Sequence, residues 1–303
     1  MGASPPISIG LPVRNGAEYL AEALGDLRSQ TFADFELLVS DNGSDDATEE
    51  IGRDAASEDP RVTYVRQPQN LGAAANYNFV FEQTTGEYFR WASHDDRCAP
   101  THLEACLRAH TDSGGASLVY PRTLLIDDSG CEIGPYDDNL DLPWPSARRR
   151  LVTFTLNWQL CNAIMGLVRR EAAARTRLID TFVSSDVVTL AELAMQGPII
   201  EVPDRLFLRR IHPGSAMQGG NTEVATWLDP NARPGTRFAE TSTLPLLYQT
   251  LLSISRNTAL PVPERVWLAA WVSGAWAYRR TRVNGGLLKH RLLRRDPPGP
   301  ALR

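Results

Sequence analysis

Short apolar segments and helical segments alternate regularly over the first third of this 303-residue chain, and no other feature of the sequence constrains the fold as much. A repeat of strand and helix predicts a mainly parallel β-sheet with helices on both of its faces. In such sheets the loops after the carboxyl ends of the strands form the ligand site. The strands are predicted at residues 7–11, 35–40, 62–65 and 88–92, and the helices at 17–30, 46–56, 71–84 and from about residue 100 onward.

The second half of the chain is less regular. Turn residues, helix caps and apolar spacing still indicate several elements there. Strands are predicted at 118–126 and 162–168, a helix at 186–196 with Ser185 as its cap, helical structure from 238 onward and a disordered tail at 297–303. We therefore expect an α/β domain over residues 1–220 and a helical C-terminal extension over residues 221–303.

Composition excludes several classes of protein. The net charge is −5, so the chain lacks the basic surface typical of nucleic-acid-binding proteins. No apolar stretch follows Met1, and no run near the C-terminus reaches the about 20 apolar residues that span a bilayer, so we expect a cytoplasmic protein. The four cysteines form no CxxC pair. Cys98, His102, Cys106 and His110 would extend along about 18 Å of helix, which is too far for one metal ion.

The C-terminal extension combines aromatic and cationic residues. Trp267, Trp271, Trp276 and Tyr278 precede a run of cations at Arg279, Arg280, Arg282, Lys289, Arg291, Arg294 and Arg295. This pattern suits peripheral contact with a membrane surface. A core helix, or a helix at a homodimer interface, with a solvated basic end would have the same pattern, and we favour this second interpretation.

Polar clusters follow three of the predicted strands, at residues 12–15, 41–46 and 93–96. Because the carboxyl ends of parallel strands share one edge of a sheet, these clusters should lie together. Asp95 and Asp96 are adjacent carboxylates at a strand end, an arrangement that favours a bound cation, and hard oxygen ligands suit Mg²⁺ or Mn²⁺. Such a cation offsets the charge that grows on a departing diphosphate.

Six strings in order resemble the motifs of family-two glycosyltransferases. They are LPVRNGAEYLAEAL, SDNGSDDAT, NLGAAANYN, RWASHDD, SSDVVTLAELAMQG and RRIHPGS, and they extend over roughly residues 7 to 216. The resemblance implies the GT-A fold, a Rossmann-like, mainly parallel mixed sheet flanked by helices. It also implies an inverting glycosyltransferase of the hexosyltransferase type that uses Mn²⁺ or Mg²⁺.

The resemblance assigns roles to individual residues. Asp41 matches a carboxylate that accepts the ring N–H of a pyrimidine base. Asp96 matches a direct metal ligand, and Asp95 matches a residue that contacts the ribose or a metal-bound water. Asp186 matches the catalytic base, and His212 matches a late histidine that completes the metal site. The other predicted contacts of the nucleotide sugar are Pro12, Val13, Arg14, Asn15, Asn70, Gly72, Asn76, Ser93 and His94.

Structural alternatives exist for several of these assignments. Asp41 would shape an Asx turn, and Asn15 would cap the first helix. His212 would pack against the turn that follows it, and Asp186 would be favoured in a first helical turn by the helix dipole.

The chain departs from the family pattern at two positions. Ser93 stands where many relatives have an aspartate, and Ser185 stands where relatives usually have a glutamate before the base. Glu192 and Asp180 are the nearby substitutes for Asp186 as the base.

The predicted function is metal-dependent transfer of one sugar, with inversion, from a UDP or dTDP donor to an acceptor hydroxyl. The acceptor would be a glycan, a lipid-linked sugar or a secondary metabolite. A Gln-x-x-Arg-Trp motif and membrane helices, which processive relatives carry, are absent from the sequence, and this favours a single addition. The alternatives are a sugar-1-phosphate nucleotidyltransferase, whose glycine-rich opening is missing, and a non-catalytic protein that binds nucleotide sugars.

Overall fold

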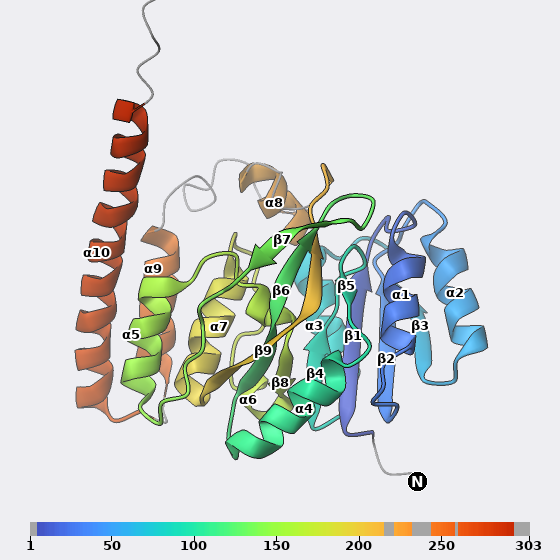
Figure 1. Ribbon diagram of the computed structural model, residues 1–303, viewed down its shortest axis with the longest axis horizontal. Coiled ribbons are helices and arrows are strands. Elements are labelled where there is room, and N and C mark those ends of the chain that lie inside the picture. The colour runs from blue at the N-terminus through green and yellow to red at the C-terminus, as the bar shows by residue number, and fades with distance from the viewer. Residues whose placement is uncertain (1–4, 215–220, 232–243, 258–259, 294–303) are drawn as a thin grey trace, which may run out of the picture.

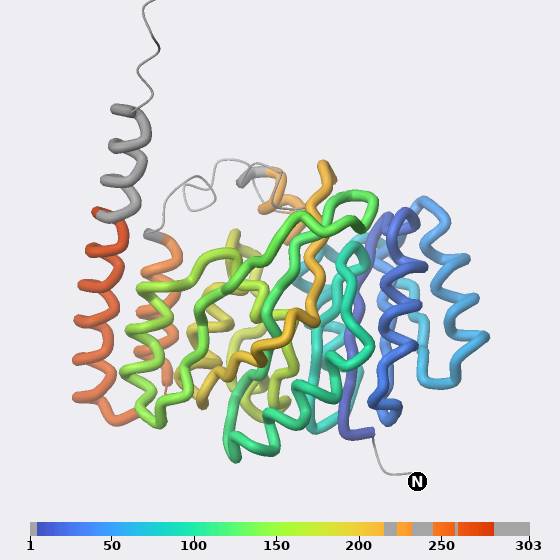
Figure 2. Tube along the Cα trace, in the orientation of Figure 1, coloured from blue at the N-terminus to red at the C-terminus, as the bar shows by residue number. Residues whose placement is uncertain are grey.

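A computed structural model describes residues 5–214, 221–231, 244–257 and 260–293 of the chain (Figures 1 and 2). Within these residues, a nine-stranded mixed sheet runs through the centre of the molecule in the order β3-β2-β1-β4-β8-β6-β9-β5, with β7 paired to β6. The parallel half comprises β1 (Ile7–Val13), β2 (Phe35–Asp41), β3 (Val62–Arg66) and β4 (Tyr88–Trp91). The mixed half comprises β5 (Arg97–Cys98), β6 (Leu118–Ile126), β7 (Glu132–Tyr136), β8 (Leu167–Arg169) and β9 (Ile199–Arg210).

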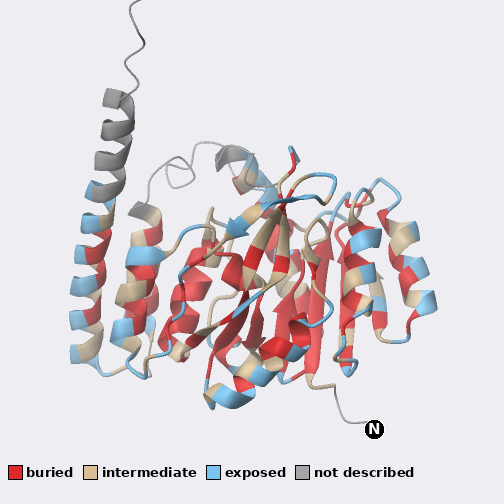
Figure 3. Ribbon diagram, viewed as in Figure 1, coloured by how far each residue is buried: buried red, intermediate tan, exposed pale blue. Residues whose placement is uncertain are grey.

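Helices cover both faces of this sheet, as the alternation of segments predicts (Figure 3). In Figure 3 the strands are mostly buried, whereas the outer faces of the helices are exposed. One face carries α1 (Leu20–Arg28), α2 (Thr48–Glu58) and α4 (His102–Ser113). The other carries α3 (Ala73–Glu82), α5 (Ala147–Asn157), α6 (Arg170–Ala173) and α7 (Ser185–Gln196).

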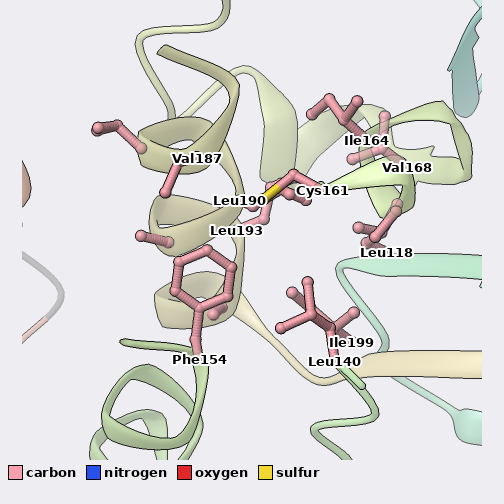
Figure 4. Close-up of a cluster of buried hydrophobic side chains, with 14 of the residues drawn as sticks. Leu118, Leu140, Phe154, Cys161, Ile164, Val168, Val187, Leu190, Leu193 and Ile199 are labelled. Carbon is pink, nitrogen blue, oxygen red and sulfur yellow. The ribbon is translucent and has the colours of Figure 1, made fainter. Parts of the chain in front are cut away.

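The most buried helix is α7, which lies between the sheet and further helices. Val187, Leu190 and Leu193 point from α7 into a cluster that includes Phe154 of α5 and Cys161 (Figure 4). Full burial of one such aliphatic side chain contributes about 1.5–3 kcal/mol to folding. Because almost all of α7 is enclosed, the start of this helix is held firmly where it meets the ligand site.

The two C-terminal helices pack onto this same layer. α9 (Leu244–Arg256) contacts α7, and α10 (Val262–Leu293) contacts α5 and α9. Their buried residues belong to the cluster that surrounds α7, namely Leu246, Ile254, Leu268, Val272 and Trp276. The described part of the extension therefore shares its hydrophobic core with the sheet. The predicted boundary at residue 220 and the predicted tail at 297–303 lie outside the described residues.

The four strands and four helices predicted for the first third are confirmed, with bounds that differ by a few residues. The predicted strand at 162–168 is wrong in its first half. A 3₁₀ helix, Asn162–Met165, precedes β8, and a Cβ added at Gly166 would lie 2.4 Å from the carbonyl oxygen of Val119. The predicted Ser185 cap is also wrong. The N-cap is Ser184, which has a left-handed backbone (φ 63°) and makes no capping hydrogen bond with its side chain.

Several elements were not predicted from the sequence, among them the helices α5 and α6 and the strands β5, β7 and β9. β9 pairs in parallel with β6, and the register between them shifts near Pro121. Among the cysteines, Cys98 lies on β5 instead of in a helix with Cys106, and all four cysteines are free thiols. No helix in the described ranges is both long and apolar enough to cross a membrane.

Candidate active site

A cavity of about 1160 Å³ opens at the carboxyl ends of the parallel strands. The ends of β1 and β4, the start of α3, the residues before and at the start of α7, the end of β9 and the helix α8 (Asn221–Leu228) line it. The sequence clusters expected to share one edge of the sheet therefore do meet. Of the predicted site residues, eleven line the cavity: Pro12, Val13, Arg14, Asn70, Asn76, Ser93, His94, Asp95, Asp96, Asp186 and His212. Asn15, Asp41 and Gly72 do not.

Asp41 is fully buried beside the cavity, and its carboxylate is surrounded by hydrogen-bond donors of the protein. It accepts hydrogen bonds from the Ser44 backbone N–H (2.8 Å) and hydroxyl (2.6 Å) and from the Tyr64 hydroxyl (2.6 Å). The Arg66 guanidinium lies 3.3 Å away. The carboxylate thus shapes its own loop, as the structural alternative predicts. A ligand N–H at Asp41 would have to replace one of these donors.

Asn15 and Gly72 shape the loops around the cavity. Asn15 has a left-handed backbone (φ 52°), and its amide oxygen accepts the Asp45 N–H at 2.9 Å. It does not cap α1, whose N-cap is Tyr19. Gly72 has φ 88° at the start of α3, and a Cβ there would lie 2.5 Å from the Leu228 carbonyl oxygen. Only glycine lets the end of α8 approach this closely.

Asn70 and Asn76 hold the loops after β2 and β3. The Asn70 amide oxygen accepts hydrogen bonds from the Asn42 side chain (3.0 Å) and the Gly72 N–H (2.9 Å). Asn76 is buried and pairs with Ser40 through both its amide oxygen (2.6 Å) and its amide nitrogen (2.9 Å). Both side chains line the cavity wall while they connect α3 to β2.

Two adjacent carboxylates form the acidic part of the cavity. Asp95 contacts Ser93 through one oxygen, and its other oxygen lies 3.0 Å from His212 Nε2. Burial raises the pKa of Asp95, but the nearby His94 and the hydrogen bonds from Ser93 and His212 outweigh burial, and the net shift is downward. Burial, together with the charge of Asp95, raises the pKa of Asp96 to about 7. The pKa values of the two carboxyl groups therefore shift in opposite directions, and additional positive charge near Asp96 would stabilise its ionised form.

Arg210 holds the Asp95–Asp96 loop in place. This side chain is only 3% exposed, and its Nε donates to the Asp95 carbonyl oxygen at 2.9 Å. Its other nitrogens reach Glu22 of α1 and the Asp128 carbonyl oxygen in the β6–β7 turn. Its backbone N–H donates to Asp96 Oδ1 at 3.0 Å. One residue thus connects three segments that are far apart in the sequence.

Asp186 lies in the first turn of α7 and faces the same cavity. Burial raises the pKa of its carboxyl group, while backbone N–H groups at the start of the helix oppose the shift. Within the described residues, Asp186 forms no ion pair. Of the two substitutes for the base, Glu192 is bound by Arg177 and Ser253, and Asp180 lies 3.7 Å from Arg177. Neither substitute lines the cavity.

Several cavity residues were not predicted as contacts. Tyr77 stands one helical turn beyond Ala73, inside a string that already suggested the family, and burial followed by the charges of Asp95, Asp96 and Asp186 raises its pKa. The exposed ring of Trp227 lies 6.3 Å from the Tyr77 ring. Asn162 and Trp158 also line the cavity, but they belong to the region around α5, which the sequence patterns did not reveal. Arg209, at the start of the string RRIHPGS, was expected to screen phosphates, and it lines the cavity as well.

The residues present fit a divalent cation only in part. Asp96 supplies a hard oxygen in a buried position that favours positive charge. His212 would have to exchange its contact with Asp95 for a metal. No group of three His, Cys, Asp or Glu side chains in the described ranges could hold a metal ion by itself. The remaining ligands would have to be oxygens of a bound diphosphate or water.

Comparison with known proteins identifies the family and the fold. The sequence model described as glycosyl transferase family 2 matches residues 8–176. A protein of Rickettsia typhi described as an uncharacterized glycosyltransferase is 39% identical over 101 residues, which are 33% of this chain and 30% of that protein. One of Haemophilus influenzae with the same description is 35% identical over 100 residues, or 33% of this chain and 40% of that protein. The matches therefore span less than half the length of these curated relatives.

Solved structures share the fold over most of the chain. S. aureus TarS in complex with UDP-GlcNAc has a TM-score of 0.65 at 16% identity, over 91% of this chain and 74% of that chain. The mannosyltransferase PcManGT from Pyrobaculum calidifontis, in complex with GDP-Man and Mn²⁺, has a TM-score of 0.57 at 17% identity. The match covers 98% of this chain and 82% of that chain. Identities this low establish the fold alone, which is the GT-A fold expected from the sequence. With the family model matching more than half of its residues, the chain belongs to glycosyl transferase family 2.

Proposed function

We propose that this protein transfers one sugar, with inversion, from a nucleoside-diphosphate donor to an acceptor hydroxyl. The observation that carries the proposal is the presence of two separate acidic sites in one cavity. Asp95 and Asp96 follow β4, and Asp186 starts α7 about ninety residues later in the chain. Inverting transfer requires such a separation, because the leaving diphosphate and the attacking hydroxyl lie on opposite faces of the sugar.

The nucleoside would bind over the ends of β1 and β2. Pro12, Arg14 and Asn70 line that part of the cavity, and Asp41 lies behind it. We propose that Asp41 accepts the ring N–H of a uridine or thymidine nucleotide in place of Arg66, its most distant donor at 3.3 Å. Adenine offers no such ring N–H. Calorimetry with UDP, dTDP and ADP tests this proposal, and Asp41→Asn should abolish any preference among the three.

The diphosphate would lie near Asp95, Asp96 and His212. Asp96 and His212 would hold Mn²⁺ or Mg²⁺ together with diphosphate oxygens, and the cation would offset charge on the leaving group. Asp95 would keep His212 oriented through their 3.0 Å contact. Full turnover in excess EDTA, or in an Asp96→Ala variant, would refute the metal dependence.

The acceptor hydroxyl would lose its proton to Asp186. A positioned carboxylate of this kind typically contributes about 10²–10⁴-fold to the rate. Because burial raises the pKa of this carboxyl group, Asp186 is a stronger base than a solvated aspartate. The acceptor would be a glycan, a lipid-linked sugar or a secondary metabolite, and the expected location of the protein is cytoplasmic.

The family match gives no support to a sugar-1-phosphate nucleotidyltransferase. A non-catalytic protein that binds nucleotide sugars is the remaining alternative, and one experiment separates it from an enzyme. Nucleotide sugars would be screened by thermal stabilisation, since a ligand that binds the folded state raises its stability. The stabilising donor would then be tested for hydrolysis by wild type and by Asp186→Asn. We expect the variant to bind the donor normally while kcat falls by about 10² or more. Binding without turnover in the wild type, for every acceptor tried, would favour the non-catalytic alternative.

A further inference from the structure

The helix α10 is apolar on two opposite faces along its first half. Its inner face packs on α5 and α9 through Leu268, Val272, Ala275 and Trp276, all of which are buried. Its outer face carries large apolar side chains that are exposed by 38% to 67%: Val262, Val266, Trp267, Trp271 and Tyr278. A helix that is hydrophobic all round is normally covered all round. Within the described residues, the Arg148 guanidinium of α5 lies over the Trp267 ring at 4.3 Å, and the other four side chains remain more than half exposed.

These five residues are called the outer face of α10. Trp267, Trp271 and Tyr278 recur at intervals of four and seven residues along one side of this face, and Val262 and Val266 lie along its other side. The exposed positions between the two rows are Pro263, Ala270, Gly274 and Ala277. The rings of Trp267 and Trp271 lie 5.3 Å apart. Single exposed hydrophobic residues are ordinary, but contiguous exposed patches mark interaction sites.

The charge of this helix identifies the kind of partner. α10 contains six Lys and Arg residues and one acidic residue, Glu264 in its first turn, although the total net charge of the chain is −5. Aromatic side chains with a polar edge, followed by cations on the same helix, are the composition of segments that bind anionic lipid surfaces. A second copy docked through the same face would bring two cation-rich helices together, which charge repulsion disfavours.

We propose that the outer face of α10 docks this protein onto an anionic lipid surface. The helix would lie along the surface with Trp267, Trp271 and Tyr278 inserted at the level of the headgroups, and the cations would contact lipid phosphates. α10 runs along one side of the molecule, toward the edge of the sheet at which α8 lies (Figure 1). Docking requires no catalytic step, and the proposal therefore does not depend on the proposed function.

Co-sedimentation with vesicles tests the proposal. We expect the full chain to bind vesicles that contain phosphatidylglycerol, to bind pure phosphatidylcholine weakly, and to lose binding as salt rises. The double variant Trp271→Ser, Tyr278→Ser should reduce partitioning at least about tenfold. The matched control is Ile133→Ser, which removes a side chain of similar exposure (56%) from β7 and should bind like wild type. Arg280→Glu, at an exposed position, should weaken binding to phosphatidylglycerol alone.

Both aromatic residues of the double variant are more than half exposed, so the variant should unfold at the temperature of the wild type. Wild type that ignores phosphatidylglycerol vesicles, or a double variant that binds them as tightly as wild type, would overturn the proposal. A dimer in solution that the double variant converts to a monomer, with vesicle binding unchanged, would instead make this face a self-association surface and would equally overturn it.

Discussion

Replacing Glu192 with glutamine should destabilise the protein without removing its catalytic base. Glu192 lies on α7 with only 10% of its side chain exposed. Its carboxylate accepts hydrogen bonds from the Arg177 backbone N–H (2.8 Å), the Arg177 Nε (3.0 Å) and the Ser253 hydroxyl (2.6 Å). Because Ser253 belongs to α9, this carboxylate ties the C-terminal extension to the core.

The size of the effect follows from what glutamine keeps. It retains the shape and one acceptor oxygen, but it turns the other acceptor into an NH₂ group among donors. Breaking a buried ion pair costs about 3–5 kcal/mol. Arg177 is partly solvated and keeps Gln249 (2.7 Å) and Ser253 (2.7 Å), so we expect a loss at or below the bottom of this range, about 2–3 kcal/mol. The entropy of unfolding is about 2.1 cal/mol/K per residue, so this loss of stability lowers the melting temperature of the 303-residue chain by about 3–5 °C.

The assay compares urea unfolding of wild type, Glu192→Gln and Asp186→Asn, with kcat measured at 25 °C for the donor found by screening. Glu192→Gln should lose stability and keep kcat within a few-fold. Asp186→Asn should keep its stability and lose kcat. A Glu192→Gln protein with wild-type stability and a kcat reduced by 10² or more would show that Glu192, and not Asp186, is the base.

Two further predictions concern stability. Burial raises the pKa of Asp186, so its ionisation costs folding free energy as pH rises above the unfolded value of about 3.9. Asp186→Asn should therefore be at least as stable as wild type at pH 8, and its gain in stability should shrink toward pH 5 when the two proteins are melted side by side. A gain in stability that grows toward pH 5 would show that the pKa of Asp186 is not raised by folding. Gly72→Ala should cost about 1–3 kcal/mol, because of its φ of 88° and the contact of the added Cβ with Leu228. Gly25→Ala, in α1 with open space around it, is the control and should be neutral or stabilising by up to about 1 kcal/mol; equal effects of the two changes would argue against strain at Gly72.

The first third of the fold could be predicted because local patterns and packing agree there. The strand at Ile7–Val13 is mainly apolar and buried on both sides, and α1 buries Leu20, Leu24 and Leu27 at helical spacing. Each polar cluster follows a strand directly, so its place at the edge of the sheet follows from chain order. Eleven of the predicted site residues line the cavity for that reason.

Prediction of the second half of the fold failed where tertiary contacts override the local sequence pattern. β9 contains Pro203, Asp204 and three arginines, so its sequence lacks the alternation of an ordinary strand. It is stabilised by parallel pairing with β6 and by a register shift near Pro121 that no local signal reveals. The residues before β8 likewise resemble a strand, but they form a 3₁₀ helix that is followed by Gly166, whose backbone packs closely on Val119 and Tyr120.

The end of β9 shows why the site depends on this unpredicted strand. Successive side chains of a strand point to opposite faces, so Arg209 and Arg210 act in different places. Arg209 reaches the cavity and contacts Asn162. Arg210 also borders the cavity, but its guanidinium binds Glu22 of α1 and the Asp95–Asp96 loop. Two identical neighbours in the sequence thus separate into one residue that can face a ligand and one that fixes the carboxylates. His212, two residues further on, then lies 3.0 Å from Asp95. The position of Asp95 and Asp96 directly after β4 predicts where these carboxylates lie. The positions of Arg210 and His212 beside them depend on the pairing of β9 with β6, which the sequence does not reveal.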